Sequence, residues 1–144
     1  MRDSPAFTLV ELLLVIALVA TVSLPLGNAF ITARSNQALV ASAEQLSDRL
    51  RQAHIFAREA KDTKGWAIIR IDSTSYALAS GTPATWEYIE TYDLERDVTI
   101  PNNFRVWYEI GTGSTAPQII LVRNNHGTEK SIIIHATGVV EIEP

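Results

Sequence analysis

The sequence contains no cysteine, and this excludes disulfide scaffolds, thiolate metal sites and cysteine nucleophiles. It also lacks a nucleophile elbow, a phosphate-binding loop and a zinc-peptidase motif. Repeats and low-complexity tracts are absent, while 47% of the residues are apolar, a proportion typical of chains that fold. For a chain of 144 residues we therefore expect one modest folded core, with no cofactor and no enzymatic activity.

Charged residues are nearly absent from one long stretch. Between Phe7 and Phe30 the only charged side chain is Glu11. The stretch is long enough to cross a bilayer as a helix, which takes about 20 residues. We therefore predict a transmembrane helix over residues 7–30. Arg2 gives the end before it a weak positive bias, which favours a cytoplasmic N-terminus and a C-terminus on the other side of the membrane.

Glu11 needs a physical explanation within such a helix. A carboxylate at membrane depth costs on the order of 2.5–3.5 kcal/mol on insertion scales. No Lys or Arg of the same stretch can compensate it. Either a partner from another chain neutralises Glu11, or the side chain lies at the level of the lipid headgroups and is hydrated. The physics of the sequence leaves both interpretations open.

The segment Ala6-Phe7-Thr8-Leu9-Val10-Glu11 resembles the processing signature of type IV pilins and type II secretion pseudopilins. The resemblance implies that prepilin peptidase cuts between Ala6 and Phe7 and that Phe7 is then N-methylated; Ala6 stands where the family usually has Gly. It also implies that Glu11 pairs with the Phe7 amine of a neighbouring subunit and so drives assembly. The implied partners are other subunits, the inner-membrane assembly platform and the lipid bilayer.

A secretory signal peptide is the alternative interpretation of the same residues. Gly27-Asn28-Ala29 offers small residues at the positions that a signal peptidase prefers, just after Pro25. Against it, the region before the apolar run holds one Arg and two acids up to Glu11, whereas signal peptides need a positive charge there.

Residues 31–64 are predicted to form an amphipathic helix that continues the first one. Pro25 and Gly27 are expected to interrupt or kink the path between them. Apolar residues then recur at spacings of three and four, as in one helical stripe: Leu39, Ala43, Leu46, Leu50, Ala53, Ala57 and Ala60. Polar residues, Ser42 among them, occupy the other positions. The stripe is short and Ala-rich, so we expect it to pack on a sheet of its own chain, and to end near Lys64 with Gly65 as the C-cap.

Residues 65–144 are predicted to form a β-rich head. Short alternating segments separated by turn residues indicate an antiparallel sandwich or paired sheets: residues 66–71, 76–79, 86–92, 98–100, 104–110, 118–123, 130–135 and 139–142. The fold class is therefore α+β, with a long N-terminal helix packed on an antiparallel sheet. Residues 1–6 would be the leader that precedes these parts.

The head is similar to one branch of the superfamily, the GspH/FimT-type minor pilins. Residues 50–60, followed by a Gly and a strand, resemble the helix end of these proteins, and Ala136-Thr-Gly-Val-Val140 resembles their closing Thr-Gly-Arg-Val element, with Val139 in place of Arg. The resemblance implies a minor subunit of a secretion or pilus filament. Many major pilins close a C-terminal loop with a disulfide, so the lack of cysteine favours the pseudopilin interpretation.

Three further groups of residues were considered as sites. His54, His126 and His135 share no ligand spacing, so we expect satisfied or solvated imidazoles and no metal. The acidic stretch over residues 87–97 is better explained as a solvated strand edge than as a calcium loop. Some FimT-type members bind DNA; here Arg123, His126 and Lys130 could gather at one hairpin with Arg105. The C-terminus is acidic, however, so we do not expect DNA as a partner.

Overall fold

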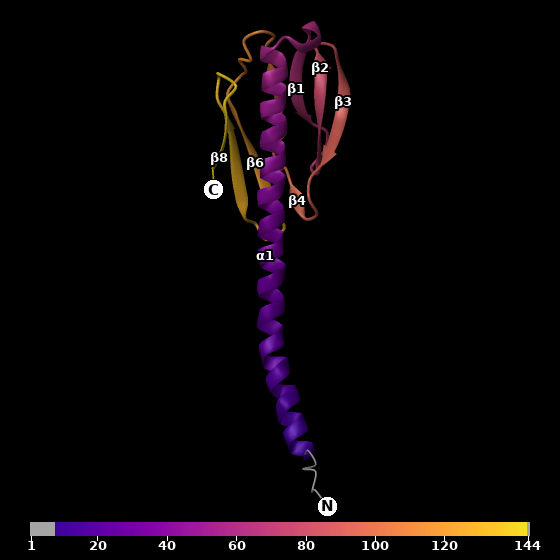
Figure 1. Cartoon of the computed structure of the whole chain (residues 1–144), viewed down its shortest axis with the longest axis vertical. Coiled ribbons are helices and arrows are strands. Elements are labelled where there is room, and N and C mark those ends of the chain that lie inside the picture. Colours follow the sequence, from indigo (N-terminus) through magenta and orange to yellow (C-terminus); the bar gives the residue numbers. More distant parts are fainter. Residues whose placement is uncertain (1–7, 144) are drawn as a thin grey trace, which may run out of the picture. The chain divides into compact units, whose positions relative to one another are not determined.

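The computed structural model describes residues 8–143, except for the side chains of residues 22–28. One helix, α1, runs from Leu9 to Arg58 (Figure 1). The chain divides into two compact units, Met1–Arg34 and Ser35–Pro144. Because α1 runs from Leu9 to Arg58 as one helix, Pro25 and Gly27 do not end it; a kink at this point stays a prediction.

The N-terminal unit consists of the first part of α1. Among the described residues, no helix combines the length and the hydropathy that crossing a membrane requires. The transmembrane helix predicted for residues 7–30 stays a prediction, because the described residues cover that stretch only in part. Residue 7 and the side chains of residues 22–28 belong to that stretch but lie outside what the structure describes.

The helix ends earlier than its sequence pattern suggests. After Arg58, a short 3-10 helix, η1, covers Lys61–Thr63, and Ala60 adopts a left-handed conformation with φ 49°. Gly65 is therefore not the C-cap, because it already belongs to the first strand. A methyl group at Gly65 would lie 2.7 Å from Cζ2 of Trp107, so the glycine makes room for an indole.

The C-terminal unit contains two antiparallel sheets of four strands each (Figure 1). Sheet A has the order β3-β2-β1-β5 and sheet B the order β4-β6-β7-β8. The strands are β1 (Gly65–Arg70), β2 (Ser75–Gly81), β3 (Trp86–Asp93), β4 (Val98–Thr99), β5 (Arg105–Tyr108), β6 (Gln118–Asn124), β7 (Glu129–Ile134) and β8 (Val140–Glu143). The predicted α+β class with paired antiparallel sheets is confirmed.

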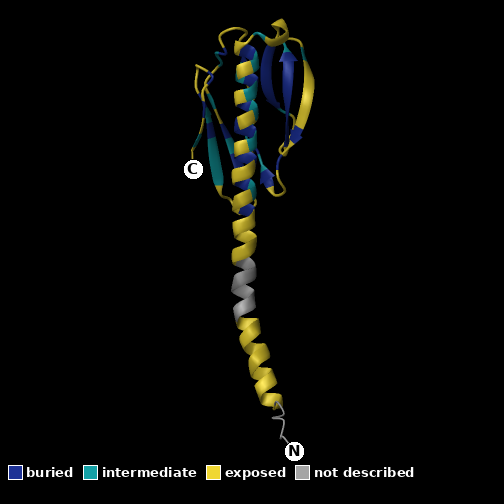
Figure 2. Ribbon diagram, viewed as in Figure 1, coloured by how far each residue is buried: buried dark blue, intermediate teal, exposed yellow. Residues whose placement is uncertain are grey.

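The main core lies between α1 and the inner faces of both sheets. Six of the seven residues of the predicted helical stripe are buried, and they share a core cluster with residues of both sheets. Figure 2 shows these buried turns of α1 against the sheets. Ala60 is only half-buried, because the helix has ended before it. The single amphipathic helix α1 covers both sheets, and this shared core allows so small a head to fold.

Ser42 departs from the predicted polar face. The side chain is fully buried, and its hydroxyl accepts a hydrogen bond from the backbone N–H of Glu95 at 3.0 Å. Ser42 is the neighbour of the buried Ala43, so it faces the loop after β3, and a small hydroxyl can satisfy a loop amide there. Sequence patterning assigned Ser42 to solvent because serine is polar.

Candidate assembly site on the N-terminal helix

The first turns of α1 carry a continuous apolar surface. Within residues 8–21 nine large apolar side chains are exposed, from Leu9, at 76% exposure, to Val19, at 59%. They occupy all sides of the helix, which is drawn as exposed throughout this part in Figure 2. Soluble proteins rarely expose contiguous apolar surface of this kind without a partner for it. This segment is therefore the strongest candidate for a docking surface in the chain.

Glu11 is the one charged residue of this surface, and it lies in the first turn of α1. Its backbone N–H donates to Oγ1 of Thr8 at 3.3 Å, and the N–H of Leu12 donates to the Thr8 carbonyl at 3.1 Å. Thr8 is thus the N-cap of α1, and Thr-x-x-Glu is the sequence pattern of a capping box. A carboxylate here is also favoured by the positive end of the helix dipole. The capping pattern Thr8-x-x-Glu11 is visible in the sequence.

Within the described part of the chain, no ion pair involves Glu11. An acid surrounded by exposed leucines is well tolerated while water reaches it. Once those leucines are covered by another molecule, the same acid needs a cation or a hydrogen-bond donor. Ala6 and Phe7, the predicted processing residues, lie outside the described residues, so cleavage between them and N-methylation of Phe7 remain predictions.

The C-terminal cations do not form one patch. Arg123 and Lys130 both belong to the β6–β7 hairpin, but Arg123 is opposite Glu129 in the register and Lys130 is opposite the buried Val122. Neighbouring cross-strand pairs point to opposite faces of a sheet, so the two cations diverge. Arg123 also forms an ion pair with Glu129. A role in nucleic-acid binding for Arg123, His126 and Lys130 remains a prediction.

Arg105 lies apart from that hairpin. It belongs to β5 in sheet A, whereas β6 and β7 belong to sheet B. His126 occupies the β6–β7 turn, where its backbone N–H donates to Oδ1 of Asn124 at 3.1 Å. Arg105 therefore belongs to sheet A, whereas Arg123 and Lys130 belong to sheet B and His126 to the turn between its strands β6 and β7.

Two acids of the predicted acidic edge already have protein partners. Glu87 pairs with Lys64 at 3.0 Å, and Glu90 accepts a hydrogen bond from the Tyr92 hydroxyl at 2.5 Å. Burial raises the pKa of Tyr92 to about 12, and the bond to Glu90 adds to this effect, so Tyr92 stays a donor at neutral pH. β3 is an edge strand of sheet A, as its alternation of large and acidic residues predicted.

His54 is a residue whose environment the sequence did not reveal. Its ring lies 5.5 Å from that of Tyr108, and its Nε2 atom is buried without a hydrogen-bond partner. Burial and, next, the charge of Arg58 lower the pKa of His54, while a hydrogen bond with the Thr137 backbone opposes the shift. The expectation of a satisfied imidazole is thus met by the bond with the Thr137 backbone but not at Nε2, which is buried without a partner.

Two left-handed glycines enclose the His54 ring. Gly113 and Gly138 have φ of 71° and 83°, and a methyl group on either would lie 2.5 Å from His54 Cδ2. Gly138 belongs to the Thr-Gly element whose sequence resembles the closing element of minor pilins. The structure gives this turn a physical function, because it packs the end of sheet B against α1.

The fold has counterparts among solved structures. The type IV minor pilin FimU of Pseudomonas aeruginosa PAO1 matches with a TM-score of 0.58 and 18% identity, over 79% of this chain and 92% of FimU. The minor pseudopilin EpsH of the Vibrio cholerae type 2 secretion system matches with a TM-score of 0.58 and 9% identity, over 73% of this chain and 94% of EpsH. No known protein family and no curated protein sequence matches the chain. The chain has the fold of these two proteins.

Proposed function

We propose that this chain, which has the fold of minor pilins and pseudopilins, is a structural subunit of a type II secretion or type IV pilus filament and not an enzyme. The observation that carries the proposal is the exposed apolar surface of α1 with its single acid, Glu11. FimU and EpsH, which share the fold, are a minor pilin and a minor pseudopilin. A filament core made of such helices would cover this surface.

The physical role of Glu11 in assembly follows from the cost of covering a charge. A carboxylate in an apolar environment costs several kcal/mol when unpaired, and a nearby amine removes most of that cost. The Phe7 amine of a neighbouring subunit is the partner that the proposal assigns to Glu11. Pairing then occurs only when two subunits are in register, so Glu11 selects the docked arrangement as well as stabilising it.

The proposal includes the maturation that exposes the Phe7 amine. Prepilin peptidase would remove residues 1–6 and the new N-terminus would be methylated, before an inner-membrane assembly platform adds the subunit to the filament. In that route the N-terminus starts in the cytoplasm and the head, Trp66–Pro144, lies in the periplasm or outside the cell.

Intact-mass measurement of the chain from cells that carry the filament machinery tests the maturation step. The expected mass lacks residues 1–6 and includes one added methyl group. Ala29→Leu is the matched control, because it blocks only the alternative signal-peptidase site. The wild-type and Ala29→Leu chains should give the same processed N-terminus. A mature chain that begins after Ala29, or an unprocessed chain, would contradict the proposal.

A further inference from the structure

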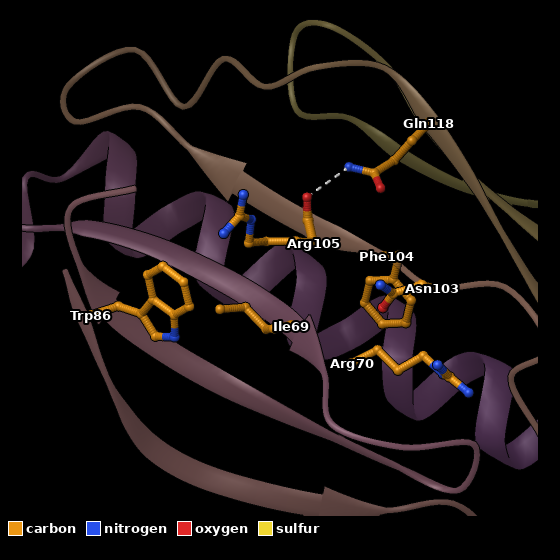
Figure 3. A pocket seen from close by; sticks show the side chains of 7 residues that line it. All are labelled: Ile69, Arg70, Trp86, Asn103, Phe104, Arg105 and Gln118. Carbon is orange, nitrogen blue, oxygen red and sulfur yellow. Dashed lines mark hydrogen bonds between the residues drawn. The ribbon is translucent and has the colours of Figure 1, made fainter. Parts of the chain in front are cut away.

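A pocket of about 500 Å³ opens on the face of sheet A that is turned away from α1. Ile69 and Arg105 are cross-strand partners in β1 and β5, so they share this face, and both belong to the pocket lining. Ile69 also packs with Trp86 in a small apolar cluster that is separate from the main core. Figure 3 shows Trp86 at one end of the pocket and Asn103 and Gln118 at the other.

The charge of this pocket is opposite to that of the chain. The lining includes Arg70 and Arg105 and no acid, although the whole chain has 16 acids and 12 Lys or Arg residues. Within the described residues, neither arginine takes part in an ion pair. The Nε atom of Arg70 is buried without a hydrogen-bond partner. Buried donors are normally satisfied, so Nε of Arg70 is short of an acceptor.

The arrangement of Arg105 suits a planar anion. Its guanidinium carbon lies 5.2 Å from the centre of the Trp86 ring, a cation–π contact that restrains the side chain. Nε2 of Gln118 donates to the backbone carbonyl of Arg105 at 3.2 Å and so fixes the strand beneath it. A guanidinium held in this way presents parallel N–H groups that match the two oxygens of a carboxylate.

The surroundings of the pocket favour a single carboxylate over a polyanion. Glu87, Glu90 and Asp93 all belong to β3, the strand that supplies Trp86, and the chain has a net charge of −4. A nucleic-acid backbone extending from the pocket would meet repulsion from these acids. A single acidic side chain would fit within the pocket and would not extend over these acids. The apolar wall of Ile69 and Trp86 would pack against the methylenes of such a side chain.

We propose that this pocket binds the carboxylate of an Asp or Glu side chain of a neighbouring subunit, and so fixes the head against that subunit. This inference rests on the proposed function, because it assumes that subunits lie side by side. The pocket belongs to the head and Glu11 to the N-terminal unit, so the two contacts can be tested separately. The pocket contact would select the neighbour, whereas the helix contact would drive assembly.

The binding test uses the full chain in detergent and N-acetyl-glutamate amide as the probe. The Trp86 indole N–H signal in an NMR titration reports on the pocket, and Trp86→Phe assigns that signal. We expect a saturable shift with the glutamate probe and none with N-acetyl-glutamine amide, which has the same shape without the charge. Equal shifts with both probes, or none with either, would overturn the inference. A tighter response to an oligothymidylate would overturn it in favour of a nucleic-acid site.

Two arginine substitutions provide the matched comparison. Arg105→Gln should weaken the glutamate response about tenfold or more, because it removes a charge-assisted hydrogen bond. Arg123→Gln should leave the response unchanged, since Arg123 is paired with Glu129 on the other sheet. Equal weakening by both substitutions would show a general charge effect and overturn the inference.

The same two variants separate this inference from the proposed function. In filaments, Arg105→Gln should lower the amount of incorporated subunit relative to Arg123→Gln, while both variants are processed normally. If both variants enter filaments equally, the pocket has no role in docking, yet the proposed function survives. If neither these variants nor the wild-type chain enters a filament, the proposed function itself fails.

Discussion

The ring of His54 shows how a single residue fixes the end of the head. Gly113 and Gly138 both lie against it, and both have left-handed φ angles. A side chain at either position would meet two obstacles, because the backbone conformation is unfavourable for L residues and the space is already filled. At an open turn a glycine is needed only for its backbone conformation, whereas Gly113 and Gly138 are also needed because a side chain would not fit beside His54.

Gly138→Ala is expected to lower the free energy of unfolding by about 2–4 kcal/mol, through overpacking against His54 together with backbone strain. Gly127→Ala is the matched control, because Gly127 has nearly the same φ, 84°, but nothing within 4 Å of the added methyl group. Its cost should be about 1 kcal/mol, from conformation alone. Denaturant unfolding of the full chain in detergent measures both, and equal costs would contradict the packing described for Gly138.

Acidification should destabilise the head through His54. Because burial and the charge of Arg58 lower the pKa of His54 from its ordinary 6.5, the unfolded chain takes up a proton more readily than the folded chain. The stability contributed by the neutral ring is complete above about pH 6.5 and is lost as the pH falls through the folded-state pKa. We expect the Tm of the wild-type chain to fall more than that of His54→Phe between about pH 7.5 and pH 5.

His126→Gln is the control for the pH experiment, because His126 lies exposed in the β6–β7 turn. It should retain the pH response of the wild-type chain. If His54→Phe and the wild-type chain lose equal stability on acidification, the response comes from other groups and the environment assigned to His54 is wrong.

At the scale of elements, the sequence predicted α1 and the strands because their patterns are local. A helical stripe or an alternating strand is visible within a window of ten residues. The end of α1 was missed because Ala60 adopts a left-handed conformation, which alanine rarely does. Gly65 was misassigned as a C-cap because the side chain that requires a glycine there belongs to Trp107. Trp107 lies 42 residues away in the chain, so the sequence alone does not show that the two residues are in contact.

The stripe of α1 makes a quantitative prediction. Leu46 is fully buried between the helix and the sheets, and Leu46→Ala should cost about 2–5 kcal/mol of unfolding free energy. Val40 lies on the same helix with 38% exposure, so Val40→Ala should cost less than about 1 kcal/mol. Chemical denaturation of both variants checks this. Similar losses would mean that α1 is not seated on the sheets by the face that the structure shows.

At the scale of the whole molecule, the arrangement of the strands was beyond sequence reasoning. β1 pairs with β5, and β4 lies in the other sheet beside β6, although neither pair is joined by a hairpin turn. No local pattern specifies these two pairings, because their strands are far apart in the sequence. The pocket at Arg105 and Trp86 is of the same kind, since it joins residues of four strands, β1, β3, β5 and β6, and a loop.

The N-terminal segment that we propose for assembly, in contrast, could be recognised from the sequence. The sequence shows Glu11 within an apolar run, and in the structure the described part of this run is exposed. The transmembrane helix over residues 7–30 stays a prediction, because the described residues cover that stretch only in part. A surface that is apolar and carries one acid is suited to docking against other subunits, where a specific ionic contact can form.

The most direct test compares Glu11→Leu with Glu44→Leu in cells that carry the filament machinery. Glu44 is an exposed acid of the same helix, within the C-terminal unit, so both substitutions remove one charge from α1. Filaments are sheared from the cells, and the subunit in them is quantified against the total processed subunit. We predict that Glu44→Leu enters filaments as the wild-type chain does, whereas Glu11→Leu is processed but absent from them. Equal incorporation of the two variants would contradict the role of Glu11 in assembly.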